Sequence, residues 1–207
     1  MRLVDLTAEL YTGLPVYPGD PPVRIEPVHT VSEHGYAVAR LELSDQAGTH
    51  VETQAHFLAD GRTLAEEPLE RFIGRASVVD VPCRLLTVAD LLPAAARIAR
   101  NPFLLLRSGY GARTPVIEPA ETARPLLPLE TLTWLVAQGI RLLGIDAFDF
   151  DAAADYAGHR FLLAHDVLVV EGLVNLEALP PEVQLYVIPL RLRGTGAAPC
   201  RAFALLS

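Results

Sequence analysis

The 207-residue sequence contains no lysine, because all 17 of its basic residues are arginine. Reactions that need a lysine amine, such as Schiff-base formation or lysine general-base catalysis, are therefore excluded. There is also no Gly-x-Ser-x-Gly nucleophile elbow and no phosphate-binding P-loop. Gly109-Tyr110-Gly111 lacks the third glycine and the following helix that a dinucleotide-binding fingerprint requires. The sequence therefore gives no support for a serine hydrolase, a P-loop nucleotidase or a nicotinamide-dependent enzyme.

Cysteine is scarce, and acidic residues outnumber basic ones. Cys83 and Cys200 are far apart and show no Cys-x-x-Cys spacing, so we expect two reduced thiols. A net charge of −8 argues against nucleic acid or an anionic membrane surface as a partner. No apolar run approaches the length of a membrane span, and Asp5 interrupts the N-terminus before a secretory apolar region can form. We therefore expect a cytoplasmic protein that acts on a small molecule.

The length and the 51% hydrophobic content are sufficient for a sizeable core, and we expect one domain covering residues 1–207. Strands are predicted at Leu3–Leu6, Val23–Val28, Tyr36–Leu43, Ala76–Val81, Phe103–Leu106, Arg141–Ile145, Val167–Val170, Leu185–Leu192 and Ala202–Leu206. Helices are predicted at Leu91–Arg100, after a Thr87–Asp90 capping box, at Pro128–Gln138 and at about Asp155–His165. This order, first rich in strands and then mixed, indicates an α/β fold with a mixed β-sheet and about three helices.

Two of the predicted strands carry more specific information. The Tyr36–Leu43 segment alternates apolar and polar residues from Val38 onward, which predicts a sheet with one solvent-exposed face. Phe103–Leu106 is apolar throughout, which predicts burial on both faces.

The segment from Ala47 to Phe57 places two imidazoles and a carboxylate within seven residues. Such a set is typical of a site for a catalytic divalent metal. His50 and Glu52 would share one face of an extended strand. His56 lies six residues from His50, about 20 Å away if the chain stays extended, so it can join them only if the chain turns after Glu52.

A second cluster contains His159 and Glu171. On one straight helix these residues would be about 18 Å apart and on different faces. The pattern instead predicts a helix that carries His159, a reversal near Asp166, and a strand that returns Glu171 towards the start of the helix. Glu171 ends an apolar run, where a carboxylate needs a partner such as a metal. His29 and His34 are interpreted as structural or surface residues, and His165 as a metal-site residue or a helix C-cap.

These residues resemble the metal-dependent hydrolase family that includes bacterial kynurenine formamidase, often called the cyclase family. The family signature is His-x-Gly-Thr-His-x-Asp-x-Pro-x-His-Phe, and residues 46–57 read Gln-Ala-Gly-Thr-His-Val-Glu-Thr-Gln-Ala-His-Phe. The similarity extends over nearly the whole chain. It includes the opening Asp5-Leu6-Thr7 with the Gly13–Pro22 segment, the middle segment Leu106–Tyr110, and the segment from His159 to Leu173.

The resemblance implies a swivelling β/β/α fold, a homodimer or homotetramer, and one or two divalent ions per chain, zinc or manganese. It implies that His50 ligates a metal, that Glu52 replaces a metal-binding aspartate, and that His56 is the general acid/base. It further implies that His159 ligates a metal, that Glu171 is a bridging carboxylate, and that Tyr17 contacts the substrate.

Three positions depart from the family signature. Gln46 replaces the first ligand histidine, and its amide oxygen suits a harder ion such as manganese or magnesium better than zinc. Glu52 is one methylene longer than aspartate, and Gln54 removes a proline that would fix the turn. We therefore favour a single metal ion.

Three functional hypotheses follow. The leading one is a metal-dependent hydrolase, similar to an arylformamidase, that cleaves an amide, lactam or lactone bond of a small aromatic substrate. Tyr17 and loop residues near Arg107 and Tyr110 would orient this substrate. The second is a metal-dependent cyclase or dehydratase of secondary metabolism. The third is a non-catalytic binding protein that has lost its metal through the substitutions at Gln46 and Glu52.

Overall fold

The computed structural model describes residues 1–110, 124–152 and 155–206. The strands are β1 (Arg2–Asp5), β2 (Arg24–His29), β3 (Val38–Glu42), β4 (His50–Glu52), β5 (Ile73–Asp80), β6 (Phe103–Arg107), β7 (Leu142–Ile145), β8 (Leu168–Glu171), β9 (Glu182–Pro189) and β10 (Ala197–Leu206). The α-helices are α1 (Val31–His34), α2 (Val88–Leu91), α3 (Ala95–Ile98), α5 (Leu129–Ala137) and α6 (Ala157–Ala164). Short 3-10 turns occupy Gln54–His56, Leu64–Glu66, Leu69–Phe72, Leu92–Ala94 and Leu176–Ala178.

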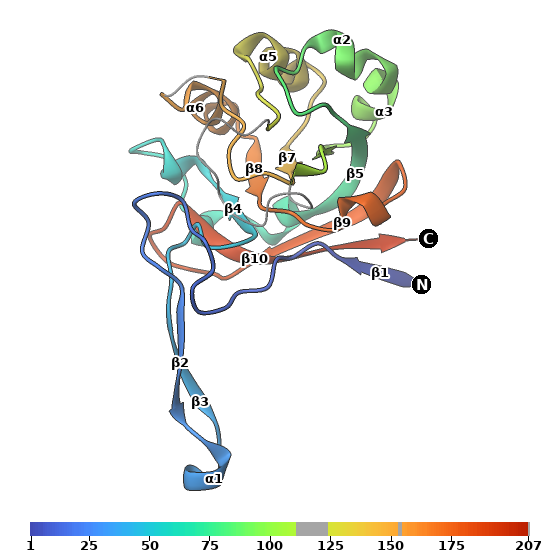
Figure 1. The fold of residues 1–207 in the computed structure, drawn as a ribbon. Coiled ribbons are helices and arrows are strands. Elements are labelled where there is room, and N and C mark those ends of the chain that lie inside the picture. Colours follow the sequence, from blue (N-terminus) through green and yellow to red (C-terminus); the bar gives the residue numbers. More distant parts are fainter. Residues whose placement is uncertain (111–123, 153–154, 207) are drawn as a thin grey trace.

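Eight strands form one mixed sheet in the order β1-β10-β4-β8-β7-β6-β5-β9. β5, β6, β7 and β8 are parallel, whereas the remaining pairs are antiparallel. The long strand β9 pairs with β5 on one side and with β10 on the other. This double pairing closes the sheet into a barrel-like arrangement, in which β9 and β10 cross beneath the parallel strands (Figure 1).

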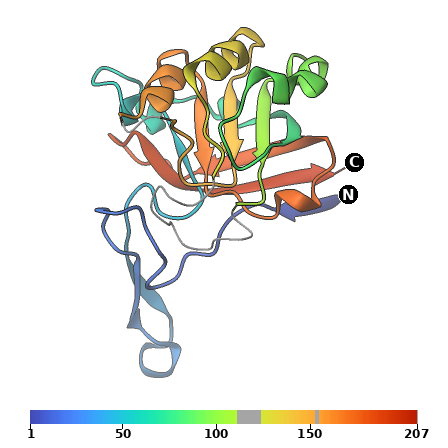
Figure 2. The same ribbon diagram turned by 45° about the horizontal axis from the view of Figure 1, so that its top comes forward.

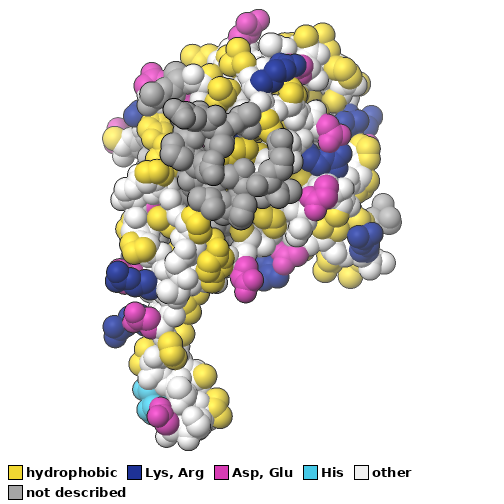
Figure 3. All heavy atoms as spheres, viewed as in Figure 1, with side chains coloured by type: hydrophobic (Ala, Val, Ile, Leu, Met, Phe, Trp, Pro, Cys, Tyr) yellow, Lys and Arg dark blue, Asp and Glu magenta, His cyan; other side chains and the backbone are white. Residues whose placement is uncertain are grey.

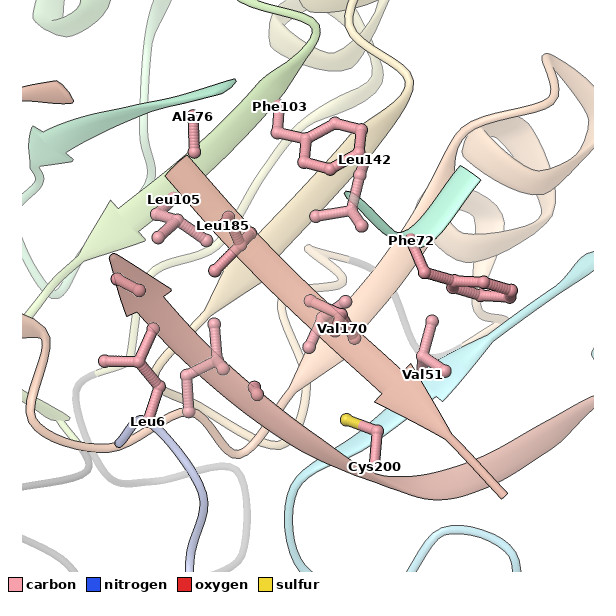
Figure 4. Close-up of a cluster of buried hydrophobic side chains, with 14 of the residues drawn as sticks. Leu6, Val51, Phe72, Ala76, Phe103, Leu105, Leu142, Val170, Leu185 and Cys200 are labelled. Carbon is pink, nitrogen blue, oxygen red and sulfur yellow. The ribbon is translucent and has the colours of Figure 1, made fainter. Parts of the chain in front are cut away.

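Two apolar cores lie on opposite faces of the parallel strands. The inner core fills the barrel, and Figure 4 shows the side chains of Phe103, Leu105 and Leu142 among those that point into it. The outer core lies beneath the helices, which cover the other face of these strands (Figure 2). Within β6, Phe103 and Leu105 belong to the inner core, and Leu104 and Leu106 to the outer one. The prediction that Phe103–Leu106 is buried on both faces is therefore confirmed.

The predicted helices are confirmed, with one change. The first begins earlier than predicted, at Val88, because Asp90 accepts hydrogen bonds from both the backbone N–H and the hydroxyl of Thr87. Pro93 then imposes a 3-10 turn between α2 and α3, so this segment is not one continuous helix. Among the described helices, none is long and apolar enough to cross a membrane.

The prediction for the Tyr36–Leu43 segment is wrong in one respect. β3 pairs only with β2, and the two strands form an arm that projects from the barrel with α1 at its tip (Figure 1). Every residue of β3 is exposed, so the alternation from Val38 does not mark a buried face within this chain. Hydrophobic side chains lie along the arm in Figure 3, and Val38 and Leu41 are among the exposed ones.

Candidate metal centre

His50 and Glu171 face each other across two paired strands. β4 and β8 run antiparallel, and their register places His50 directly opposite Glu171. Glu52 lies two residues further along β4, so the alternation of a strand puts it on the same face as His50. Val51, between them, belongs to the core inside the barrel. The three polar side chains therefore lie on the face that the helices cover, and the predicted sharing of one face is confirmed.

The Gly-Thr pair before His50 fixes this geometry. The Thr49 hydroxyl donates to the backbone oxygen of Gly172 at 2.6 Å and accepts from the N–H of Ala8 at 2.9 Å. Gly48 and Gly172 both have positive φ, and a Cβ on Gly172 would lie 2.8 Å from the Gly48 oxygen. That same Gly48 oxygen lies 2.9 Å from Nδ1 of His50 and can only accept. His50 thus carries its proton on Nδ1, which leaves Nε2 directed at the carboxylates.

His159 approaches the same place from helix α6. Its Nε2 lies 3.1 Å from Oε1 of Glu171 and 3.7 Å from Oε2 of Glu52. After α6 the chain reverses at Asp166, which has a φ of 62°, and β8 then returns to the site. The predicted helix, reversal and strand are confirmed.

The side-chain atoms are spaced as ligands of one cation would be. Nε2 of His50 lies 3.7 Å from Oε1 of Glu52 and 3.8 Å from Oε2 of Glu171. In a tetrahedral site with bonds near 2.1 Å, ligand atoms lie roughly 3.4 Å apart. Among the described residues, Nε2 of His50 and Oε2 of Glu52 are buried and have no hydrogen-bond partner. A divalent cation would satisfy both atoms, so the residues present fit a metal ion.

The buried acids and imidazoles shift one another's pKa. Burial alone would lower the pKa of His50, but the nearby carboxylates of Glu52 and Glu171 outweigh it and raise the pKa. For His159, burial is likewise outweighed, chiefly by the charge of Glu52 and the hydrogen bond with Asp151, and the pKa lies well above its ordinary value. Burial raises the pKa of Glu171. Burial also opposes a negative charge on Glu52, but the charge of His159 and the nearby His50 imidazole bring the pKa of Glu52 down to about 2. The imidazoles therefore hold protons that a metal ion must displace.

The chain turns after Glu52, as predicted, and brings His56 back to the site. The 3-10 turn Gln54–His56 directs Nε2 of His56 to 3.3 Å from Oε1 of Glu52. Gln54 stands where the family signature has proline. Its side chain helps to hold the turn, because its oxygen accepts a hydrogen bond from the N–H of Arg62 at 3.2 Å. His56 is about one-quarter exposed, so it can meet a molecule in the pocket.

Gly196, in the loop between β9 and β10, supports the turn that carries His56. Its backbone oxygen accepts from the N–H of Thr53 at 2.7 Å and from the Thr53 hydroxyl at 3.1 Å. A Cβ at Gly196 would lie only 2.2 Å from the backbone nitrogen of His56. The two backbone segments thus approach each other as closely as only glycine allows.

The centre opens into a pocket of about 460 Å³. Its aromatic walls comprise Tyr17, Phe57, Phe148 and Tyr156. The hydroxyls of Tyr17 and Tyr156 are 3.0 Å apart, and this hydrogen bond, with partial burial, raises the pKa of Tyr17 to about 12. Tyr17 thus lies at the pocket with its phenol protonated near neutral pH, and its contact with the substrate stays a prediction.

Gln46 lines the pocket, with its amide nitrogen 3.4 Å from Nδ1 of His56, and its role as a metal ligand stays a prediction. Arg107 instead binds the carboxylate of Asp80 and donates to two backbone oxygens. Tyr110 is buried in the outer core. Neither Arg107 nor Tyr110 is among the described residues that line the pocket. Residues 111–123, which follow Tyr110, lie outside the described residues, so the role of loop residues near Arg107 and Tyr110 in orienting the substrate stays a prediction.

Sequence reasoning missed two residues of this region. Asp151 bonds Nδ1 of His159, and Tyr156 precedes α6 with a φ of 56°. A signal for the first was present, because acidic residues follow directly after the buried strand β7 at Asp146, Asp149 and Asp151. Carboxyl ends of parallel strands are where sites of α/β proteins form. Nothing in the sequence distinguished Tyr156 from other surface aromatics.

The family model described as "Putative cyclase" matches residues 4–152, which include His50, Glu52 and His56. Isatin hydrolase A from Ralstonia solanacearum has a similar structure, with 24% identity, a TM-score of 0.88, and coverage of 100% of this chain and 92% of that one. Isatin hydrolase A from Labrenzia aggregata, bound to benzyl benzoate, gives 23% identity, a TM-score of 0.87 and coverage of 98% and 93%. A structure described as a potential metal-dependent hydrolase with cyclase activity shows 24% identity and a TM-score of 0.78. The match covers 98% of this chain and 96% of that one.

These structures extend the shared fold past residue 152, to the helix and strand that carry His159 and Glu171. The predicted α/β fold with a mixed sheet is thereby confirmed. Since the family model covers well over half of the sequence, the chain belongs to the cyclase family.

Proposed function

We propose that the protein is a divalent-metal-dependent hydrolase that opens an amide, lactam or lactone bond in a small aromatic substrate. The observation that carries this proposal is the convergence of His50, Glu52, His159 and Glu171 at an aromatic-walled pocket. Similarity to isatin hydrolases supports a cyclic aromatic amide, because isatin is such a lactam. An N-formyl arylamine presents the same carbonyl, nitrogen and ring, so arylformamidase activity belongs to the same proposal.

The cation would be held by His50, Glu52, His159 and Glu171. One zinc or manganese ion suits this mixed nitrogen and oxygen donor set. When bound, it would supply Lewis acidity towards the substrate carbonyl and lower the pKa of a water molecule.

His56 is placed to move the proton that hydrolysis requires. It lies at the pocket, in contact with Glu52, and is partly exposed. In its neutral form it can accept a proton from the attacking water and then deliver it to the leaving nitrogen or oxygen. The Glu52 contact orients the imidazole during this transfer. Tyr17 and Tyr156 offer hydroxyls at the mouth, where they would hold a polar substituent of the substrate.

The test combines metal content with turnover of isatin, formanilide and an aryl lactone. His50→Ala is expected to lose both bound metal and activity. His56→Ala is expected to keep the metal but lose about 10²–10⁴-fold in rate, the usual contribution of general acid–base catalysis. The control is His165→Ala, an exposed histidine at the end of α6 that bonds only its own helix among the described contacts. If the His50 and His56 variants match wild type in both metal and rate, the proposal is lost.

We also propose that the protein forms a homodimer or larger homo-oligomer through the β2–β3 arm. An isolated two-stranded ribbon is marginally stable in water. This one carries an exposed series of large apolar side chains, namely Val28, Val31, Tyr36, Val38 and Leu41. A second copy of the chain would cover them.

The oligomer proposal is tested by light scattering during size-exclusion chromatography. Wild type should elute with at least twice the chain mass of 22.5 kDa. Leu41→Ser combined with Val31→Ser should shift the population towards the monomer. A wild-type protein that remains a monomer at high micromolar concentration would contradict the proposal.

A further inference from the structure

Asp151 is a buried carboxylate whose two oxygens are fully engaged by neighbours. One oxygen accepts from the backbone N–H of Gly158, and the other accepts from the N–H and the ring Nδ1 of His159. The residue is only 5% exposed. A Cβ at Gly158 would lie 2.5 Å from the first oxygen, so glycine there is what lets the carboxylate reach the start of α6.

The segment that carries Asp151 is itself held in place. Its backbone N–H donates to Asp149 at 2.8 Å, and Arg124 binds the Asp149 carboxylate at 2.7 Å. Asp151 also forms a β-bridge with Leu127. The ring of the intervening Phe150 stacks on the His159 imidazole, with centroids 4.2 Å apart and planes inclined by 23°. The His159 imidazole thus stacks on the Phe150 ring with one face and contacts the Asp151 carboxylate through Nδ1.

Asp149, Asp151 and His159 are also close enough together to raise the question of a second metal site. The contacts argue against it. Asp151 accepts three N–H donors, and Asp149 is neutralised by Arg124. In the proposed site of His50, Glu52 and Glu171, by contrast, Nε2 of His50 has no hydrogen-bond partner among the described residues. The contacts of Asp151 instead hold the imidazole of His159, which is itself the proposed metal ligand.

We propose that Asp151 is a positioning residue that fixes the proton of His159 on Nδ1 and turns Nε2 towards Glu52 and Glu171. This inference rests on the proposed function, because it requires that His159 ligate the metal. Carboxylate partners of ligand imidazoles commonly set the tautomer and the ring orientation, and their loss weakens metal binding about 10–100-fold. His50 receives the same support from a backbone oxygen, that of Gly48. Both imidazoles would then present Nε2 to one ion.

The first test measures zinc affinity by competition with a chromophoric chelator at constant pH. Asp151→Asn is expected to bind Zn²⁺ about 10–100-fold more weakly than wild type. The matched control is Asp155→Asn, because Asp155 also accepts a hydrogen bond from the first turn of α6, the N–H of Ala157 at 3.2 Å. This control should stay within about twofold of wild type. Equal zinc affinity of Asp151→Asn and wild type would overturn the inference.

The second test needs no change at Asp151, so it remains decisive if that variant fails to fold. Long-range ¹H–¹⁵N correlation spectra of the zinc-loaded wild-type protein report which ring nitrogen of each histidine is protonated, with His159 assigned by comparison with His159→Gln. A protonated Nδ1 and a metal-shifted Nε2 are expected; the reverse pattern refutes the inference. If wild type binds neither zinc nor manganese, the proposed function fails, and this inference fails with it.

Discussion

Replacing Gly196 with alanine should remove most of the proposed activity without touching any side chain of the site. The new Cβ would lie 2.2 Å from the backbone nitrogen of His56, 2.5 Å from its Cα and 2.6 Å from the carbonyl carbon of Ala55. All three are backbone atoms, so no rotamer change can relieve the contact. Ordinary contact begins near 3.4 Å, so the turn that carries His56 must move by about 1.2 Å.

A displacement of about 1 Å at a catalytic group typically reduces the rate about 10²-fold. We therefore expect Gly196→Ala to lower kcat by about two orders of magnitude on the best of the three test substrates. Metal content should stay close to that of wild type, because His50 and Glu171 lie on strands that the turn does not carry. The assay is steady-state turnover alongside elemental analysis and a melting curve.

The matched control is Gly194→Ala in the same β9–β10 loop. Gly194 has a φ of +79°, so alanine there is strained by about 1–2 kcal/mol, but its Cβ would meet nothing within 4 Å. The control therefore separates loss of stability from displacement of His56. Wild-type kcat in Gly196→Ala, or equal losses in both variants, would refute the reasoning.

Three further predictions concern the metal centre and the pocket. Glu171→Gln should weaken zinc binding by more than about 10-fold, because it removes an anionic ligand while keeping the shape; unchanged affinity in a chelator competition would exclude Glu171 from the site. In EDTA, the melting temperature should fall as the pH rises above about 6.5. The raised pKa values of His50 and His159 give stability that is complete below their unfolded pKa and is lost as the pH passes their folded pKa. A flat or rising profile would contradict those protonation states. Tyr17→Phe should lower kcat/KM by about 2–10-fold, the value of one hydrogen bond, because it removes the hydroxyl that would hold a polar substituent of the substrate. No change would mean that the hydroxyl does not meet the substrate.

Much of the fold could be predicted because the apolar pattern of the parallel strands reflects their surroundings directly. Phe103–Leu106 lies between two cores, and its sequence is apolar on both faces for that reason. The β2–β3 arm was misjudged because alternation reports a period of two residues but not what covers the apolar side. Val38 and Leu41 show the pattern of a half-buried strand although this chain leaves them exposed.

The candidate site was predictable to the extent that its residues are close in sequence or end a buried strand. His50, Glu52 and His56 form one short motif, and Glu171 ends an apolar run. Asp151 was missed because its bond to His159 depends on how the segment after β7 meets the start of α6. That meeting is a tertiary contact, and several acidic residues in the same stretch were equally good candidates.

The pairing of His50 with Glu171 also makes metal uptake a reporter of correct strand alignment. A slip of one position between β4 and β8 would turn the polar side chains of one of these strands towards the barrel interior and bring Val51 or Val170 to the helix side. Such a species could keep nearly the same content of helix and strand yet lack part of the ligand set at the surface that the helices cover. Stoichiometric zinc in refolded protein would thus indicate that β4 and β8, which lie more than a hundred residues apart in the sequence, have paired in the native register.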